Sequence, residues 1–186
     1  MKRLTSIILI IIVFNTFGQS VEMTKDELPT YQGVITMTGK DAKQIYGLLK
    51  EWVAKNYKSA KDVIQVDDPE NGKLVLKGID KYLIEAAMGV KAENACYHTI
   101  TLETKPEKFR FTIEVTEVTT GTMNQPMLRD VLLSNPPIKP NGKPYSGAML
   151  NGVLKQKEQH LTHINSLKIG LITTLSRLAT IKKDDW

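Results

Sequence analysis

The chain has 186 residues, a formal net charge of +5 and a single cysteine. One cysteine excludes an internal disulfide, and the length suits one ordinary domain with its own core. The small basic excess is typical of solvated surface. It would suit a weak attraction to anionic lipid or polysaccharide without demonstrating either.

The first residues have the features of an export signal. Two basic residues precede an apolar run at positions 4–17, and Gly18 is the small residue before the expected cut. This pattern predicts a signal peptide over residues 1–18, so the mature protein would be periplasmic or secreted. The run is shorter than the roughly 20 residues that span a bilayer, so we expect no transmembrane segment in the mature chain; a retained anchor is the alternative. No cysteine follows Gly18, which argues against a lipoprotein anchor.

The leader and the first two elements follow. Residues 19–30 are polar and aperiodic, which predicts a flexible leader. Residues 31–38 are rich in β-branched side chains and predict a strand. Asp41 is a suitable N-cap for a helix that continues to about Tyr57. The apolar face of this helix is expected to hold Ile45, Leu48, Leu49, Trp52 and Val53.

The middle of the chain predicts two strand pairs. Residues 62–66 and 73–79 flank a turn rich in turn-forming residues, so they form a hairpin. Residues 80–94 are too apolar for a free loop, and either prolong the strand or cap one end of the core.

The second pair, 95–104 and 109–116, alternates between apolar and polar residues, as in an antiparallel sheet covered on one face. The polar face, which should meet water, holds Thr99, Thr101, Arg110, Thr112, Glu114 and Thr116.

A long connection and a long helix complete the chain. Residues 119–149 carry five prolines and no sustained pattern, apart from a stretch at 127–133 that could form two helical turns. Residues 151–181 predict one long helix whose apolar stripe lies on the sheet. Such a helix should overhang the sheet, so the 119–149 loop, the 80–94 segment or a second copy of the protein should cover the overhang. The stripe comprises Leu150, Leu154, Leu161, Ile164, Leu171, Leu175 and Leu178, widened by Val153 and Leu167.

These elements predict an α+β fold, a single domain over residues 31–181, in the order strand, helix, four strands, helix. Residues 45–78 and 97–115 resemble an exported family from Bacteroidetes, a domain of unknown function with a fold like TATA-binding protein. The matching parts are the helix with Trp52, the DD-containing turn and the GKLVLKG return strand. The resemblance implies a curved antiparallel sheet covered by a long C-terminal helix, together with export, but no chemistry.

Three groups of residues are weak candidates for chemistry. His160 and His163 are neighbours on the last helix and are candidate zinc ligands, although no third ligand is evident and a solvated pair is the simpler interpretation. Cys96 and His98 share one face of a strand, but such residues stand roughly 6–7 Å apart, and Cys96 is expected to be a small buried side chain. The acidic turn at 67–70 lacks the EF-hand pattern for calcium. We expect no metal and no cofactor.

The pattern therefore favours a non-catalytic binding or interaction module of the periplasm or cell envelope. Its partner would be an unknown envelope protein or a small apolar ligand, with no nucleic acid, and a homodimer through the C-terminal helix is possible. The alternative is a hydrolase with a histidine as base, His98, His160 or His163. The candidate residues of a binding crevice beside the last helix are Met127, Leu128, Tyr145, Leu161 and Ile164.

Overall fold

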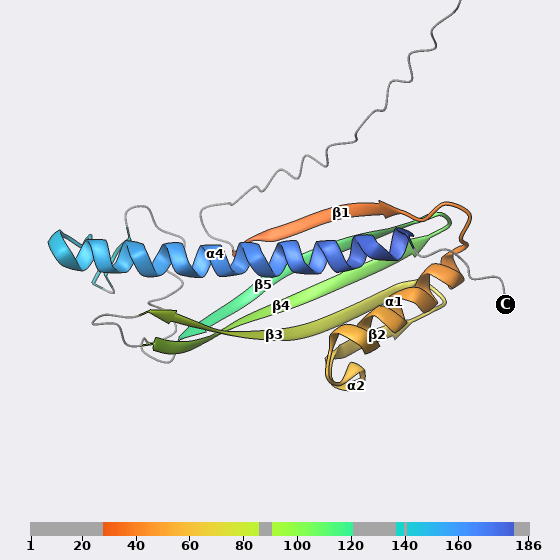
Figure 1. Cartoon of the computed structure of the whole chain (residues 1–186), viewed down its shortest axis with the longest axis horizontal. Coiled ribbons are helices and arrows are strands. Elements are labelled where there is room, and N and C mark those ends of the chain that lie inside the picture. Colours follow the sequence, from red (N-terminus) through yellow and green to blue (C-terminus); the bar gives the residue numbers. More distant parts are fainter. Residues whose placement is uncertain (1–27, 86–90, 121–136, 140, 181–186) are drawn as a thin grey trace, which may run out of the picture.

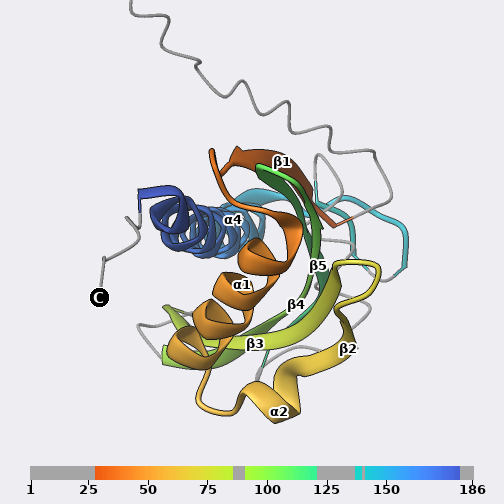
Figure 2. The same cartoon turned by 90° about the vertical axis from the view of Figure 1, so that its right-hand side faces the viewer.

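The computed structural model describes residues 28–85, 91–120, 137–139 and 141–180. Five strands form one antiparallel sheet in the order β1-β5-β4-β3-β2. The sheet curves around α1 and α4, which lie on the same face (Figures 1 and 2). The elements are β1 Thr30–Thr36, α1 Ala42–Asn56, α2 Ala60–Val63, β2 Ile64–Asp68, β3 Lys73–Glu85, β4 Lys91–Lys105, β5 Lys108–Thr120, α4 Gly147–Arg177 and the 3-10 turn η2 Leu178–Thr180. The predicted α+β class and its order of strands and long helices are confirmed.

Helix α1 begins where the sequence predicts. The carboxylate of Asp41 accepts a hydrogen bond from the Gln44 amide, and the Gln44 side chain accepts one from the Asp41 amide. This reciprocal capping box satisfies two donors that a helix N-terminus otherwise leaves unpaired. The helix then buries Ile45, Leu49 and Trp52 against the sheet.

The stretch after α1 differs from the prediction in two ways. Residues 60–63 form the short helix α2, because Ser59 caps the Asp62 amide, so strand β2 begins only at Ile64. Residues 80–85 prolong β3, and β4 already begins at Lys91, so β3 and β4 are a long hairpin. The ambiguous segment therefore belongs to the sheet rather than to a cap over the core.

The inner face of the sheet forms the core. Every second residue of β3, β4 and β5 points toward the helices, as the pleat of a strand requires. Fully or nearly fully buried side chains on this face include Leu74, Leu76, Ile100, Leu102, Phe109, Phe111 and Ile113. Ile164 and Leu175 of α4 belong to the same cluster, and burial of each such side chain stabilises the fold by roughly 1.5–3 kcal/mol. The predicted burial of the strand pairs under the last helix is confirmed.

Strand β5 contains a bulge that the alternating pattern did not reveal. His98 pairs with Val115 and Tyr97 pairs with Glu117, so Thr116 is an extra residue on β5. Beyond it the inward positions change from odd to even numbers, and Val118 is buried. The predicted strand stopped at residue 116, whereas β5 continues to Thr120.

The buried face of α4 is turned relative to the predicted stripe. Val153 and His160 are buried, whereas Leu154 is 40% exposed and Leu161 is half-buried. The helix can bury His160 because the His160 ring has a hydrogen-bond partner on β3. The spacing of apolar residues along the sequence does not reveal such a partner.

The N-terminal end of α4 extends beyond the ends of β3 and β4 (Figure 1). There Tyr145 and Val153 form a second small cluster, with Leu150 packed against it. Tyr145 belongs to the predicted 119–149 loop, so this residue of the loop does cover part of the overhang. The predicted helical turns at 127–133 lie outside the described residues, as does the predicted signal peptide. Within the described part of the chain, no helix is both long and apolar enough to cross a membrane.

Candidate functional site

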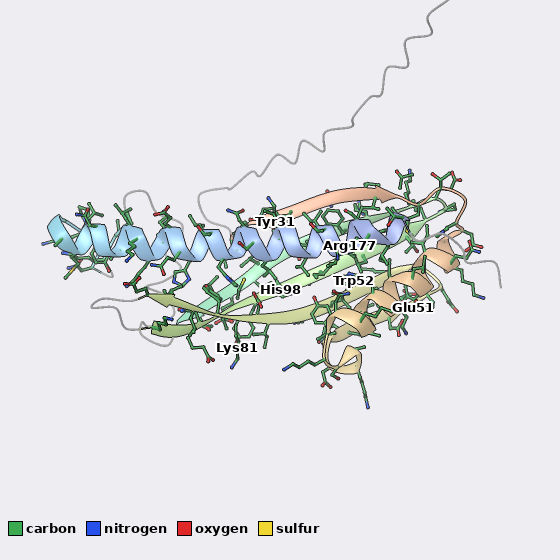
Figure 3. The ribbon with its side chains drawn as sticks, viewed as in Figure 1. Tyr31, Glu51, Trp52, Lys81, His98 and Arg177 are labelled. Carbon is green, nitrogen blue, oxygen red and sulfur yellow. The ribbon has the colours of Figure 1, made fainter. Side chains whose placement is uncertain are left out.

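Polar side chains gather where α4 crosses the inner face of β3 and β4. Asp80 and Tyr82 come from β3, Cys96 and His98 from β4, and His160 and His163 from α4; we call these six residues the histidine cluster. Asp80 pairs with Cys96 across the hairpin, and Gly78 pairs with His98. Figure 3 shows His98 between the sheet and the helix layer.

One half of the cluster is a histidine–aspartate contact that an aromatic ring supports. Nε2 of His163 lies 2.7 Å from Oδ2 of Asp80, and both side chains are partly exposed. The His163 ring also stacks on Tyr82, with ring centroids 3.7 Å apart and planes 11° from parallel. Asp80 therefore orients an imidazole that solvent can reach.

The other half is sealed from solvent. The Tyr82 hydroxyl lies 2.6 Å from Nδ1 of His160, which is only 1% exposed. Burial, and then the nearby His163, lower the pKa of His160 to about 4. His160 is thus neutral at physiological pH, and its Nδ1 shares one hydrogen bond with the Tyr82 hydroxyl. Burial also raises the pKa of Tyr82, which therefore stays a phenol.

Cys96 and His98 do not form a nucleophile and base. Cys96 is fully buried, and burial, followed by the charge of Asp80, raises the pKa of its thiol to about 12. His98 is 3% exposed, and burial lowers the pKa of its ring. Its Nε2 lies 3.4 Å from the Tyr57 hydroxyl rather than beside the thiol. A buried thiol in this state is an inert packing group, as the sequence suggests.

The arrangement also gives the histidines no metal-binding geometry. Among the described residues, no three or more His, Cys, Asp or Glu side chains are placed to hold a metal ion. His160 and His163 each use a ring nitrogen for a protein partner. The interpretation of both histidines as a solvated pair is wrong for His160, which lies inside the helix–sheet interface because Tyr82 satisfies it.

The acidic turn is occupied by protein contacts as well. Asp67 accepts a 2.6 Å hydrogen bond from the Tyr46 hydroxyl and pairs with Lys50. Asp68 accepts hydrogen bonds from the backbone and side-chain amides of Asn71. These contacts tie the β2–β3 hairpin to α1 and close its turn.

The residues of the predicted crevice fall into separate places. Ile164 is in the main core, whereas Tyr145 is in the small cluster at the other end of α4. Leu161 is half-buried between them. Met127 and Leu128 lie outside the described residues, so a crevice that includes them stays a prediction.

The outer face of the sheet carries features that the sequence reading missed. A hollow of about 200 Å³ near the β4–β5 turn is lined by Val34, Glu103, Lys105, Lys108 and Arg110, so it is mostly charged. Four large apolar side chains also remain exposed on this face: Val34, Val66, Ile79 and Leu83. Alternation along residues 73–85 was the signal that could have placed Ile79 and Leu83 outward, together with Tyr82 inward.

The comparisons with known proteins agree with this fold. A curved antiparallel sheet with two helices on one face is a TBP-like α+β domain, and the histidine cluster adds no recognised catalytic arrangement to it. Residues 31–118 match the family described as "Domain of unknown function (DUF4468) with TBP-like fold", so the chain carries a DUF4468 domain.

Two solved structures resemble most of the chain. The crystal structure of a DUF4468 family protein from Bacteroides ovatus is 12% identical, with a TM-score of 0.57 over 83% of this chain and 90% of that one. A TBP-like protein from Parabacteroides distasonis is 11% identical, with a TM-score of 0.48 over 83% of this chain and 96% of that one. No curated protein matches the sequence. At this identity, the first likeness shows the fold alone.

Proposed function

We propose that the chain is a non-catalytic interaction module of the periplasm or cell envelope, which binds a protein partner through strand β3. The observation that carries this proposal is which side chains of β3 are exposed: polar side chains face the core, and large aliphatic ones face solvent. The polar cluster is turned inward, whereas Ile79 and Leu83 are 59% and 61% exposed on the outer side. Large exposed apolar side chains close together are typical of interaction surfaces.

A protein partner suits this surface better than a small apolar ligand. Lys77 and Lys81 alternate with the two aliphatic residues along the same face of β3. An alternating row of aliphatic and charged side chains recognises another polypeptide by side-chain pairing, whereas small ligands bind in concave sites. The location in the envelope rests on the predicted signal peptide. It is tested by the mass of the protein in a periplasmic extract, which should correspond to a chain that begins at Gln19.

The test of the interaction uses a photo-crosslinking amino acid at single positions in cells. We expect a discrete adduct from position 83 and none from position 51, where Glu51 is exposed on α1. The absence of any adduct from positions 79 and 83, with the protein folded and exported, would overturn the proposal.

The hydrolase alternative is tested in parallel through its most exposed candidate base. His163→Gln removes the imidazole that Asp80 orients and leaves the buried His160 in place. We expect wild type and His163→Gln to show the same background rates on ester, phosphate and peptide substrates. A rate that falls with this variant, while its melting temperature is preserved, would establish an enzyme instead.

A further inference from the structure

Strand β3 has a long backbone edge that no described strand covers. On one side β3 pairs with β4 over its whole length, from Lys73 to Glu85. On the other side it pairs with β2, whose last partner is Leu76. Residues 77–85, which we call the open edge, thus have no strand beside them within the described part of the chain. Figure 1 shows β3 continuing beyond β2 along the border of the sheet.

The contacts at Glu85 show which backbone groups face outward. The Gln159 side chain accepts a 2.8 Å hydrogen bond from the Glu85 amide and donates a 3.4 Å one to its carbonyl oxygen. These groups are therefore not turned toward β4. Because backbone groups of alternate residues point the same way, those of Ile79, Lys81 and Leu83 also face the open edge.

We propose that the open edge pairs antiparallel with the same edge of a second copy, around a two-fold axis at Lys81. This inference rests on the proposed function and names its partner. Lys81 is the central residue of the nine, so the overlap is centred on residues 79–83, between helix α2 at one end of the edge and the Gln159–Glu85 hydrogen bonds at the other. The residues that face outward at 79, 81 and 83 can then exchange about six backbone hydrogen bonds with the second copy.

The outer side chains are self-complementary in this register. Ile79 of one copy lies opposite Leu83 of the other, and Lys77 lies opposite Glu85. The two-fold axis makes each of these pairs twice. Opposed aliphatic pairs and opposite charges both stabilise neighbouring strands.

Registers shifted by one residue lose this match. Centring the pair on Asp80 places two aspartates opposite each other, and centring it on Tyr82 places Ile79 opposite Glu85. The sequence of the open edge therefore favours one alignment of the two strands over nonspecific association.

The charge at the centre of the pair is already compensated. Lys81 would meet its own copy, but each Lys81 ammonium pairs with Glu93 of β4 at 3.0 Å. Lys81 points away from α4 at the border of the sheet (Figure 3). Lysines on edge strands usually discourage pairing. Here Lys77 favours one register, because only that register places it opposite a carboxylate, that of Glu85, which also pairs with Lys155 of α4.

A dimer through α4, which the sequence suggests, is less favoured by the contacts. The continuous apolar face of α4 is turned to its own sheet, where Ile164 and Leu175 are buried in the core. Along residues 79–83 of the open edge, backbone groups that no strand pairs stand beside the exposed side chains of Ile79 and Leu83.

The first experiment measures distance at the axis. In the two-fold pair the Lys81 Cα atoms stand about 5.5 Å apart, within the range that a disulfide bridges. The Lys77 Cα atoms stand roughly 27 Å apart at about 3.4 Å per residue. Under mild oxidation, the mature chain with Lys81→Cys should become a covalent dimer and Lys77→Cys should not. Cys96 is buried and does not compete.

The second experiment measures the mass of the assembly by sedimentation and tests the register with charge variants. We expect a dimer for the mature chain, a monomer for Ile79→Lys, and a dimerisation Kd weakened roughly two- to tenfold for Lys77→Glu. The double variant Lys77→Glu/Glu85→Lys should regain the affinity, because the charges are exchanged. Thermal melts check that each variant is folded, and Glu51→Lys on α1 is the matched surface control.

A monomeric wild type, or equal crosslinking at positions 77 and 81, would overturn the two-fold pair. If the photo-crosslinked adducts from position 83 then contain a different envelope protein, the proposed function stands and only this inference fails. If neither a dimer nor any adduct forms, both fail.

Discussion

The hydroxyl of Tyr82 lies 2.6 Å from Nδ1 of His160 and joins the C-terminal part of β3 to the middle of α4. This contact makes a buried histidine compatible with a helix face that is otherwise apolar. It also explains why α4 presents one particular face to the sheet. If the helix rotated about its own axis, this hydrogen bond would break and its buried groups would lose their partner.

Tyr82→Phe tests how much this contact contributes to the stability of the protein. The variant keeps the ring that stacks on His163 but removes the hydroxyl that bonds to His160. We expect the free energy of unfolding to fall by about 1–3 kcal/mol, since a buried ring nitrogen loses its partner. Urea denaturation measures the change. Tyr97→Phe, on the outer face of the same hairpin, is the matched control and should change stability by less. An equal effect of the two substitutions would show that the buried contact contributes little.

The stability of the protein should depend on pH through His160. Its pKa is about 4 in the folded chain, against an ordinary value of 6.5. The unfolded chain therefore takes up a proton first as the pH falls, and the free energy of unfolding decreases from about pH 6.5 downward. Between pH 8 and pH 5 we expect a loss of about 2 kcal/mol from this residue. Burial lowers the pKa of His98 as well, which adds a loss of the same sign.

The comparison that isolates His160 is a His160→Gln variant measured over the same pH range. Each protein is referred to its own stability at pH 8, so the cost of the substitution itself cancels. The slope of the variant should be shallower. Identical slopes would assign the pH dependence to other groups.

Two glycine substitutions should have effects of opposite sign. A Cβ on Gly78 would lie 2.3 Å from Nε2 of His98. Gly78→Ala therefore overpacks the core and should cost about 1–3 kcal/mol. Gly170 lies in α4 with open space around its Cβ position, so Gly170→Ala should stabilise the helix by up to about 1 kcal/mol. Thermal unfolding of the two variants measures both signs. A destabilised Gly170→Ala would contradict the open space beside α4.

The Cys96 thiol should be unreactive in the native protein. It is fully buried, and its pKa is raised to about 12, so little thiolate forms. We expect labelling by a thiol reagent to be slow in native buffer and complete in concentrated urea. A Glu51→Cys variant provides an exposed thiol on α1 of the same fold and should be labelled at once. Rapid labelling of native wild type would place Cys96 nearer to solvent than the structure does.

Much of the fold could be predicted because its strongest signals are local. The capping residue Asp41, the alternation from Phe109 to Ile113 and the leucines of the last helix each act over a few residues. Two boundaries could not be predicted for the same reason. Residues 80–85 are a strand because β4 pairs with them, and Thr116 is a bulge because β4 has no residue opposite it.

The candidate site escaped prediction because its contacts join distant parts of the sequence. Asp80 and His163 are recognisable as a pair only after β3 and α4 are packed together. In the sequence, His160 is indistinguishable from a solvated histidine. The pattern of polar and apolar residues along a helix does not show that Tyr82 lies beside it in the fold. The outward Leu83 was hidden because residues 80–94 were not recognised as a strand, and Ile79 was only the last residue of the predicted strand 73–79.

The bulge at Thr116 has a consequence for the shape of the molecule. An extra residue on one strand lengthens that strand relative to its neighbour and strengthens the local bend and twist. Deleting Thr116 would leave Val115 and Glu117 opposite their present partners, so the pairing would survive while the sheet straightened. A chain shorter by this single residue should thus keep the β4–β5 pairing and curve less around the helices.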